Sequence, residues 1–228
     1  SANFTRGIYL STTKNFSLKE SSVDVFSEAS NAQALYINKA FATYSTRDIT
    51  IEDSHLHLKS GGTTQSHSGI SIDAGNPVVQ TIRIANSTVF NENPVGISRE
   101  EAVLIQDKLN AMNYVTVTVE NNVLVNIAPK SSRSQGLEIS NVKTASVSHN
   151  LIFPGFAEST GPIYGLLLSK IPTEVRISNN MIFGGIGREG SSGTSTTFYS
   201  DKNPSLNVEN NFFLVGSAQA AGNNKYGV

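Results

Sequence analysis

Three acidic residues and a lysine recur roughly once every 30 residues along the chain and are the first candidates for chemistry: Asp73, Asp107, Glu138 and Lys170. Pairs of carboxylic acids hydrolyse glycosidic bonds by acid and base catalysis. A basic side chain, often assisted by calcium, abstracts the proton beside a uronate carboxyl group in a lyase. The four residues can act together only if the fold brings them to one face. A solvated polar surface is the alternative interpretation.

Tyrosines and histidines form the second set of candidates. The chain has no tryptophan, so an aromatic platform for a sugar ring must use tyrosine or phenylalanine. Tyr9, Tyr36 and Tyr199 are the candidates for ligand binding, and an ordinary aromatic contact is the alternative. His55 and His57 flank one leucine, and two histidines at this spacing on a strand can share a metal ion. No acidic third ligand is fixed by the spacing, so the sequence predicts no metal site.

The composition excludes several classes of function. The 228 residues carry a net charge of −1, with 15% charged residues and no basic stripe, which argues against binding nucleic acid. The absence of cysteine excludes disulfides, thiolate metal sites and thiol nucleophiles. No apolar run approaches the roughly 20 residues of a membrane span. Low charge and abundant small polar residues suggest a secreted or cell-surface protein, and the start at Ser1 without a signal sequence suggests a mature or trimmed product.

A repeat determines where the candidate residues lie. The stretch VRISNNMIFGG at 175–185 places two asparagines between alternating apolar segments, although asparagine is a poor strand residue. The arrangement recurs as VTVENNVLV at 117–125 and LNVENNFFL at 206–214, and seven copies fit the chain. Each copy follows a strand-like segment that starts with a small residue, such as GLLLS from Gly165. Apolar residues alternate with period two, which excludes helical repeats of similar length.

The repeats predict an all-β fold, a single right-handed parallel β-helix of about seven coils over residues 1–228. The chain is then either a β-helix with unusual caps or a segment of a longer one. The stretch 98–113 conflicts locally, because Ser98 and Glu101 match a helical capping box and apolar residues follow at helical spacing. The spacing of the neighbouring repeats favours a strand at 102–106, since stacking commonly overrides local propensity.

The paired asparagines have a structural explanation. The corner between the second and third strands of a coil needs a residue that tolerates the left-handed conformation, and asparagine does so at low cost. Stacked coils place equivalent amide side chains above one another, where they can form a hydrogen-bonded ladder. Serines occupy this position in the first three coils, which predicts a looser ladder there. The predicted structural ladder consists of Asn122, Asn150, Asn180 and Asn211.

The pattern G-I-x-L…V-x-I-x-N-N-x-I-F resembles the β-helix repeat of the pectate-lyase-like superfamily, most closely in GIYLSTTKNFSLKESSVDVF and GLLLSKIPTEVRISNNMIFGG. The resemblance covers essentially the whole chain. That superfamily includes polysaccharide lyases and hydrolases, phage tailspikes and surface adhesive proteins, so the resemblance specifies the fold and not the function. It implies that the outer face of the first strands lines a substrate groove, with calcium as a cofactor only if the chain is a lyase.

The third strands carry a separate anomaly. In coils four to seven they are apolar on both faces, and an exposed apolar patch of this size marks an interface unless a loop covers it. Candidate covers are 156–162, 186–195 and the tail from Ala218. The alternative is a protein partner or an oligomer contact through Val125, Phe153, Phe183 and Leu214.

Two classes of function remain open on the sequence. The first is a secreted or cell-surface scaffold of the adhesin type, which presents loops to a glycan or a protein partner. The second is a polysaccharide lyase or glycoside hydrolase that acts on the outer face of the first sheet through Asp73, Asp107, Glu138 and Lys170. The absence of an evident catalytic cluster favours the scaffold, without a cofactor.

Overall fold

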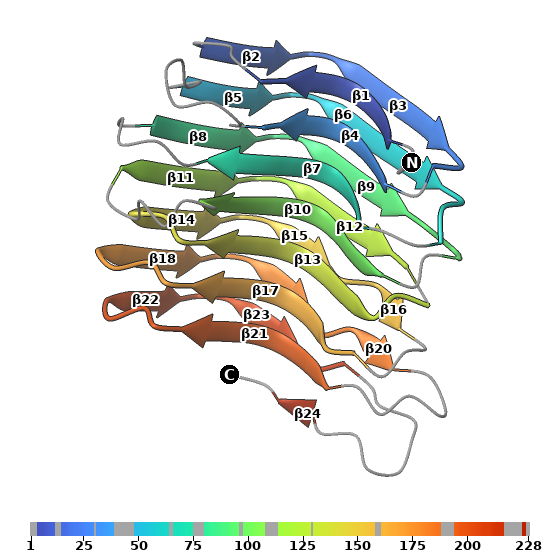
Figure 1. The fold of residues 1–228 in the computed structure, drawn as a ribbon. Helices are drawn as coiled ribbons and strands as arrows, with labels where there is room; N and C mark the ends of the chain where they lie inside the picture. The colour runs from blue at the N-terminus through green and yellow to red at the C-terminus, as the bar shows by residue number, and fades with distance from the viewer. Residues whose placement is uncertain are drawn as a thin grey trace.

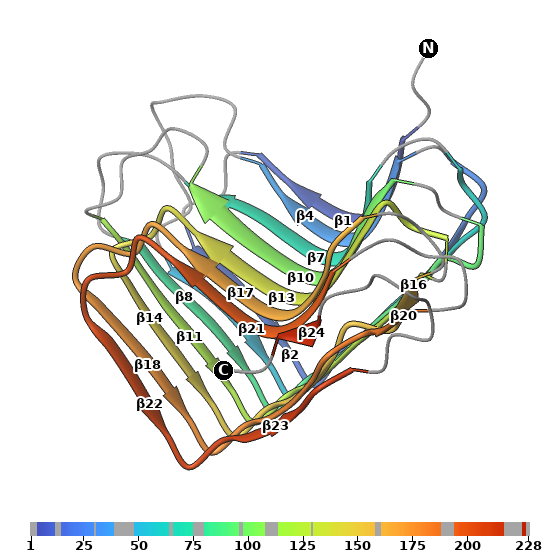
Figure 2. The same cartoon turned by 90° about the horizontal axis from the view of Figure 1, so that it is seen from below.

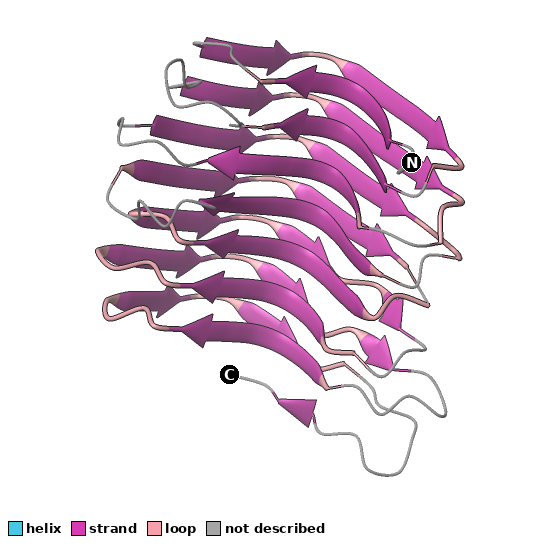
Figure 3. Ribbon diagram, in the orientation of Figure 1, coloured by secondary structure: helices cyan, strands magenta, loops and turns pink. Residues whose placement is uncertain are grey.

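The computed structural model is built from β-strands, and its described part contains no helix (Figure 3). No described segment therefore provides a helix long and apolar enough to cross a membrane. The described residues are 4–11, 15–29, 31–38, 48–63, 66–74, 80–95, 98–107, 114–128, 130–157, 161–187, 194–216 and 225–226.

Three parallel sheets run along the stack. The first sheet contains β1 (Phe4–Leu10), β4 (Asn31–Ile37), β7 (His67–Ala74), β10 (Arg99–Asp107), β13 (Arg133–Ser140), β17 (Ile163–Ser169), β21 (Ser195–Asp201) and β24 (Lys225–Tyr226). The second contains β2 (Asn15–Lys19), β5 (Asp48–Glu52), β8 (Gln80–Ala85), β11 (Val115–Glu120), β14 (Thr144–Ser148), β18 (Glu174–Ser178) and β22 (Leu206–Glu209). The third contains β3 (Ser22–Ser27), β6 (His55–Ser60), β9 (Thr88–Glu92), β12 (Val123–Ile127), β15 (Leu151–Phe153), β19 (Met181–Phe183) and β23 (Phe212–Leu214). The pair β16 (Phe156–Ala157) and β20 (Ile186–Gly187) forms a small fourth sheet.

The order of strands confirms the parallel β-helix. Each repeat contributes one strand to each of the three large sheets, so that strands three apart in the first coils lie side by side (Figure 1). Viewed from below, the three sheets surround one interior (Figure 2). The arrangement is consistent with the right-handed winding predicted for parallel connections. Because β10 spans Arg99–Asp107, the prediction of a strand at 102–106 is confirmed.

The inward-facing side chains of the alternating strands fill the interior. In the first sheet, Leu35 and Ile37 lie in register with Ile70 and Ile72 of the next coil, and all four are buried. The second and third sheets contribute the same type of side chain, such as Ile84 and Leu124. Aliphatic side chains stacked coil upon coil make one continuous core, as expected of a solenoid.

In β1, β4, β7, β10, β13 and β17 of the first sheet, a glycine or alanine occupies one equivalent position, where the strand bends (Figure 1). Gly136 of β13 has no room for a side chain, because a Cβ there would lie 2.4 Å from Cγ2 of Ile152 in β15. The next residue, Leu137, also faces the interior and is buried. Gly136 and Leu137 therefore face the interior one after the other, which interrupts the alternation of the strand. As a result, the residue before the glycine faces outward. This irregularity determines which side chains reach the outer surface of the first sheet.

Two consecutive residues form the corner before the third sheet, and each has a different role. The first residue of each pair has a positive φ, from 46° at Glu20 to 57° at His149. The second residue forms the ladder, and the amide of Asn150 donates to Oδ1 of Asn180 at 2.9 Å. Equivalent bonds join Asn122 to Asn150 and Asn180 to Asn211. The predicted asparagine ladder is therefore confirmed, and the left-handed conformation belongs to the preceding residue.

Serines continue the ladder with longer bonds. The backbone amide of Ser21 donates to Oγ of Ser54 at 3.3 Å, and that of Ser54 donates to Oγ of Ser87 at 3.1 Å. The corresponding amide of Asn150 lies 2.9 Å from Oδ1 of Asn180. A hydroxyl is shorter than a carboxamide and has a single donor. The predicted looser ladder in the first three coils is confirmed.

Candidate ligand-binding groove

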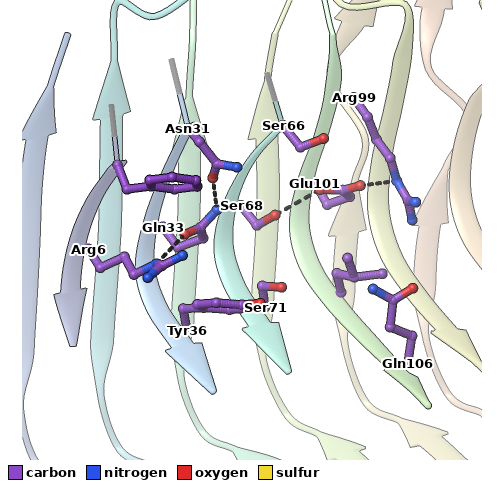
Figure 4. A pocket seen from close by; sticks show the side chains of 12 residues that line it. Arg6, Asn31, Gln33, Tyr36, Ser66, Ser68, Ser71, Arg99, Glu101 and Gln106 are labelled. Atoms are coloured by element: carbon purple, nitrogen blue, oxygen red, sulfur yellow. Dashed lines mark hydrogen bonds and ion pairs between the residues drawn. The ribbon is translucent and has the colours of Figure 1, made fainter. Parts of the chain in front are cut away.

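A groove of about 380 Å³ lies on the outer face of the first sheet, over β1, β4, β7 and β10. Figure 4 shows its side chains projecting from neighbouring strands toward a common space. We call it the first-sheet groove; its lining includes Arg6, Gln33, Tyr36, Ser68, Arg99 and Glu101. Parallel register places these residues on consecutive coils, about 4.8 Å apart.

Arg6 and the rings of Phe4 and Tyr36 form one end of the groove, and the ring of Tyr9 lies beside it. The guanidinium carbon of Arg6 lies 4.9, 4.6 and 4.5 Å from the ring centroids of Phe4, Tyr9 and Tyr36. The two tyrosine rings stack with their centroids 5.7 Å apart. Among the described residues, no carboxylate lies within ion-pair distance of Arg6, whose Nε donates to Oε1 of Gln33 at 3.3 Å. A cation on aromatic faces, with no acidic partner there, is suited to a polar ligand.

Amide and hydroxyl groups line the middle of the groove. Gln33 accepts a hydrogen bond from Arg6 at Oε1 and donates one from Nε2 to Oδ1 of Asn31. One coil further along the stack, Oγ of Ser68 donates to Oε2 of Glu101 at 2.8 Å. Figure 4 shows these contacts as two separate groups, one that joins Arg6, Gln33 and Asn31 and one that joins Ser68 to Glu101. Groups with both donors and acceptors can exchange these bonds for bonds to ligand hydroxyls.

A charged cluster forms the other end of the groove. Arg99 contacts Glu101, and its Nη2 lies 2.7 Å from Oε2 of Glu138. Oε2 of Glu138 also accepts hydrogen bonds from Gln135 at 2.6 Å and from Arg133 at 3.1 Å. Burial raises the pKa of Glu101, and the nearby Arg99 opposes that rise. Multiple partners hold each carboxylate in one orientation, so the cluster is a rigid wall.

The four predicted catalytic residues do not converge. Asp73 accepts hydrogen bonds from the hydroxyl of Tyr36 at 3.0 Å and from Gln106 at 2.9 Å. Glu138 belongs to the charged cluster described above. Lys170 is exposed after β17, where it has a φ of 55° and its backbone amide bonds to Asp201. Its backbone thus forms the turn out of the first sheet, away from the groove.

The outward position predicted for Asp107 is wrong. Strand alternation continues to the end of β10, so Gln106 faces outward and Asp107 faces the interior, in register with the buried Ala74. Its side chain has an exposed fraction of 0%. A substrate on the outer face cannot reach this carboxylate.

The tyrosines are divided between two places. Tyr9 and Tyr36 stack beside the groove, as described above. Tyr199 lies on β21 at the far end of the sheet, with its ring centroid 5.4 Å from that of Tyr164. Tyr164 in turn lies 5.5 Å from the guanidinium carbon of Arg133. Aromatic rings therefore occur at both ends of the sheet, and their role in ligand binding stays a prediction.

Sequence reasoning missed the residues that line most of the groove. Four of the lining residues directly precede the small residue from which the repeat predicted each strand to begin: Arg6, Gln33, Ser68 and Glu101. The strands begin two or three residues earlier in the structure. A polar residue directly before the small residue was the available signal. It went unused because the bend breaks the alternation on which strand faces were assigned.

A second polar cluster lies inside the β-helix. Nδ1 of His67 and Oε1 of Glu100 are 2.8 Å apart, and both side chains are fully buried. Asn93 contacts both groups at 2.9 and 3.1 Å. Desolvation raises the pKa of Glu100 to about 7. Burial alone would lower the pKa of His67, but Glu100 reverses this effect and raises it. Both groups are fully buried, so the network lies apart from the surface of the first-sheet groove.

The outer face of the third sheet keeps an apolar surface. Leu214 has an exposed fraction of 46%, and Val125, Phe153 and Phe183 are half-buried. The rings of Phe153 and Phe183 pack edge to face with centroids 5.9 Å apart. Of the three segments predicted as covers, residues 158–160, 188–193 and most of the tail from Ala218 lie outside the described residues, whereas 156–157 and 186–187 form β16 and β20. The partner interface at this surface stays a prediction.

Comparisons with known proteins add no family. No family model, curated protein or solved structure matches the chain. The resemblance to the pectate-lyase-like superfamily therefore rests on the repeat pattern and the β-helical architecture alone, and function must be argued from the groove.

Proposed function

We propose that the chain is a secreted or cell-surface β-helical scaffold that binds a glycan in the first-sheet groove without cleaving it. The observation that carries the proposal is the aromatic end of the groove, where Arg6 lies on the rings of Tyr9 and Tyr36. Sugar rings pack their apolar faces on aromatic side chains, and their hydroxyls bond to amides and charged groups. The groove combines aromatic rings, the guanidinium of Arg6 that packs on them, and amide groups on consecutive coils, so a sugar ring would bind beside or in place of this guanidinium.

The state of the carboxylates supports binding over catalysis. Glu138 receives hydrogen bonds from three side chains, and Asp73 from two. Glu101 contacts Arg99 and Ser68. An acid or base catalyst must exchange a proton with its substrate, whereas these groups are held by protein donors. Fixed polar groups on a rigid stack are suited to recognition.

The alternative is a polysaccharide lyase or glycoside hydrolase. The observation in its favour is that three carboxylates, of Asp73, Glu101 and Glu138, are on or beside the same groove together with Arg99. Cleavage by this route would require substrate binding to displace the present partners of at least one carboxylate. The two functions predict different products, so one experiment separates them.

The test combines glycan-array binding with a degradation screen on neutral and uronate polymers, with and without calcium. We expect saturable binding to at least one glycan and no new reducing or unsaturated ends. Tyr36→Ala and Arg6→Ala should each weaken binding at least about tenfold, equivalent to about 1.4 kcal/mol. Product release would establish the enzyme instead.

A matched control is available on another sheet. Arg176→Ala removes an arginine of β18 whose side chain is 65% exposed and pairs with Glu174. This change should leave glycan binding unaltered. Equal loss of binding in Arg6→Ala and Arg176→Ala would refute the groove as the binding site, and absence of any glycan ligand would refute the proposed function.

A further inference from the structure

Two histidines and an aspartate gather on the outer face of the third sheet. His55 and His57 of β6 flank the buried Leu56, so both project outward. Parallel register places Asp24 of β3 directly opposite His57. One potential ligand atom from each of these three residues lies within 4.8 Å of the other two. The third ligand that spacing alone does not supply thus comes from the neighbouring coil.

The spacing of the ligand atoms matches a metal better than a hydrogen bond. Nδ1 of His57 lies 3.6 Å from Oδ1 of Asp24, beyond the usual range of about 2.7–3.2 Å for a hydrogen bond. Ligand atoms bound tetrahedrally at zinc distances are about 3.4 Å apart. The other ligand atoms of the group lie within 4.8 Å of one another and would have to approach further to reach this spacing.

His57 stands between two carboxylates. Nδ1 faces Asp24, and Nε2 lies 3.7 Å from Oε2 of Glu92. Nε2 is buried and has no hydrogen-bond partner among the described residues. In a neutral imidazole only one nitrogen carries a proton, so the lone pair of the other nitrogen faces a carboxylate. A cation between Nδ1 and Asp24 removes this repulsion and leaves the Nε2 proton directed at Glu92.

The surroundings hold the ligands in position. Oγ of Ser22 donates to Oδ2 of Asp24 at 2.9 Å, which leaves Oδ1 directed at His57. The ring of His57 packs edge to face against Phe26 and Phe90, with centroid distances of 6.2 and 5.9 Å. A carboxylate beside the far nitrogen of a metal-binding histidine is a common supporting contact, and Glu92 lies on that side of His57, 3.7 Å from Nε2.

We propose that Asp24, His55 and His57 form a binding site for a transition-metal dication of the zinc class. Two imidazoles and one carboxylate favour zinc, copper or nickel, whereas calcium and magnesium prefer oxygen ligands. Asp24 and His55 are exposed, so water can complete the coordination. The site connects coils one and two and is separate from the first-sheet groove. Because the metal binds the folded state, it stabilises these coils.

The test is a titration of the full chain, without a histidine tag, by Zn²⁺ in a calorimeter and by Co²⁺ with visible absorption. We expect one equivalent of Zn²⁺ to bind and to raise the melting temperature, and the Co²⁺ complex to show visible bands. His55→Ala and Asp24→Asn should each weaken binding by at least about tenfold. Both residues are exposed, so these variants are expected to fold.

His149→Asn is the matched control, because it removes a histidine from a distant corner where φ is 57° and asparagine is tolerated. Zn²⁺ binding should be unchanged in this variant. Lack of saturable Zn²⁺ binding overturns the proposal. Binding that survives both His55→Ala and Asp24→Asn, or that is lost equally in His149→Asn, overturns it as well.

Discussion

Replacing Asn150 by alanine should destabilise the β-helix more than any exposed substitution. Its side-chain amide donates to the carbonyls of Val119 and Ser148 and to Oδ1 of Asn180, all at 2.9 Å. Its Oδ1 accepts from the backbone and side-chain nitrogens of Asn122 at 3.0 and 2.9 Å. The side-chain amide has two hydrogens for these three acceptors, so it makes two full hydrogen bonds. Together with the two bonds that Oδ1 accepts, the side chain makes four hydrogen bonds at about 1 kcal/mol each, and we expect a loss of about 4 kcal/mol.

The first three coils supply an internal comparison. Oγ of Ser87 accepts from the amide of Ser54 and donates to the carbonyl of Ala85. A serine in coil five should retain two equivalent bonds, so Asn150→Ser should cost about 2 kcal/mol, half as much as Asn150→Ala.

The assay is urea unfolding followed by far-UV circular dichroism, with the slope of each transition checked for a change in cooperativity. The reasoning is refuted if both variants unfold within about 0.5 kcal/mol of the unmodified chain. It is also refuted if Asn150→Ser is no more stable than Asn150→Ala, because the ladder would then not depend on the acceptor at this corner.

Three further perturbations test other parts of the fold. Gly136→Ala places a Cβ 2.4 Å from Ile152 and should lower the free energy of unfolding by about 1–3 kcal/mol; an unchanged urea midpoint would contradict the bend. Glu100 and His67 both have folded pKa values above their unfolded values. Their stabilisation is therefore present at acidic pH and lost as pH rises through these folded values, so the melting temperature should fall between about pH 5 and pH 8. Glu100→Gln should flatten this dependence, and a melting temperature that rises over the same interval in the unmodified chain would contradict it. Arg83→Ala breaks two ion pairs on the second sheet, but its side chain is 36% exposed, so the change should cost less than about 1 kcal/mol in urea unfolding.

Local periodicity was enough to predict the architecture. Alternating segments such as VRIS at 175–178 can bury one face only as strands, and their recurrence leaves stacking as the way to cover the open edges. The asparagine pair identified the corner, because its position in each repeat is constant. The division of labour within the pair was not predictable from residue type, since asparagine suits both the left-handed residue and the ladder position.

The groove depended on information that is not local. Strand faces were assigned by alternation, and the bend at the small residue moves Arg6, Gln33 and Glu101 to the outer surface. At the other end of the strand, alternation places Asp107 in the interior, although an acidic side chain is usually found at the surface. Charge and polarity therefore identified candidates without giving their direction.

Residue order by itself determined the coils, the corners and the aliphatic core, because each depends on a pattern within one repeat. The alignment of the first two repeats also predicted that Tyr9 stacks on Tyr36, and the structure confirms this contact. Only the tertiary structure decided the other contacts between coils, because they depend on the full register of the strands. It joins Arg99 to Glu138 and places Asp24 opposite His57. Loops of variable length separate these partners in the sequence, and the stacked backbone hydrogen bonds bring them to within one coil spacing of each other.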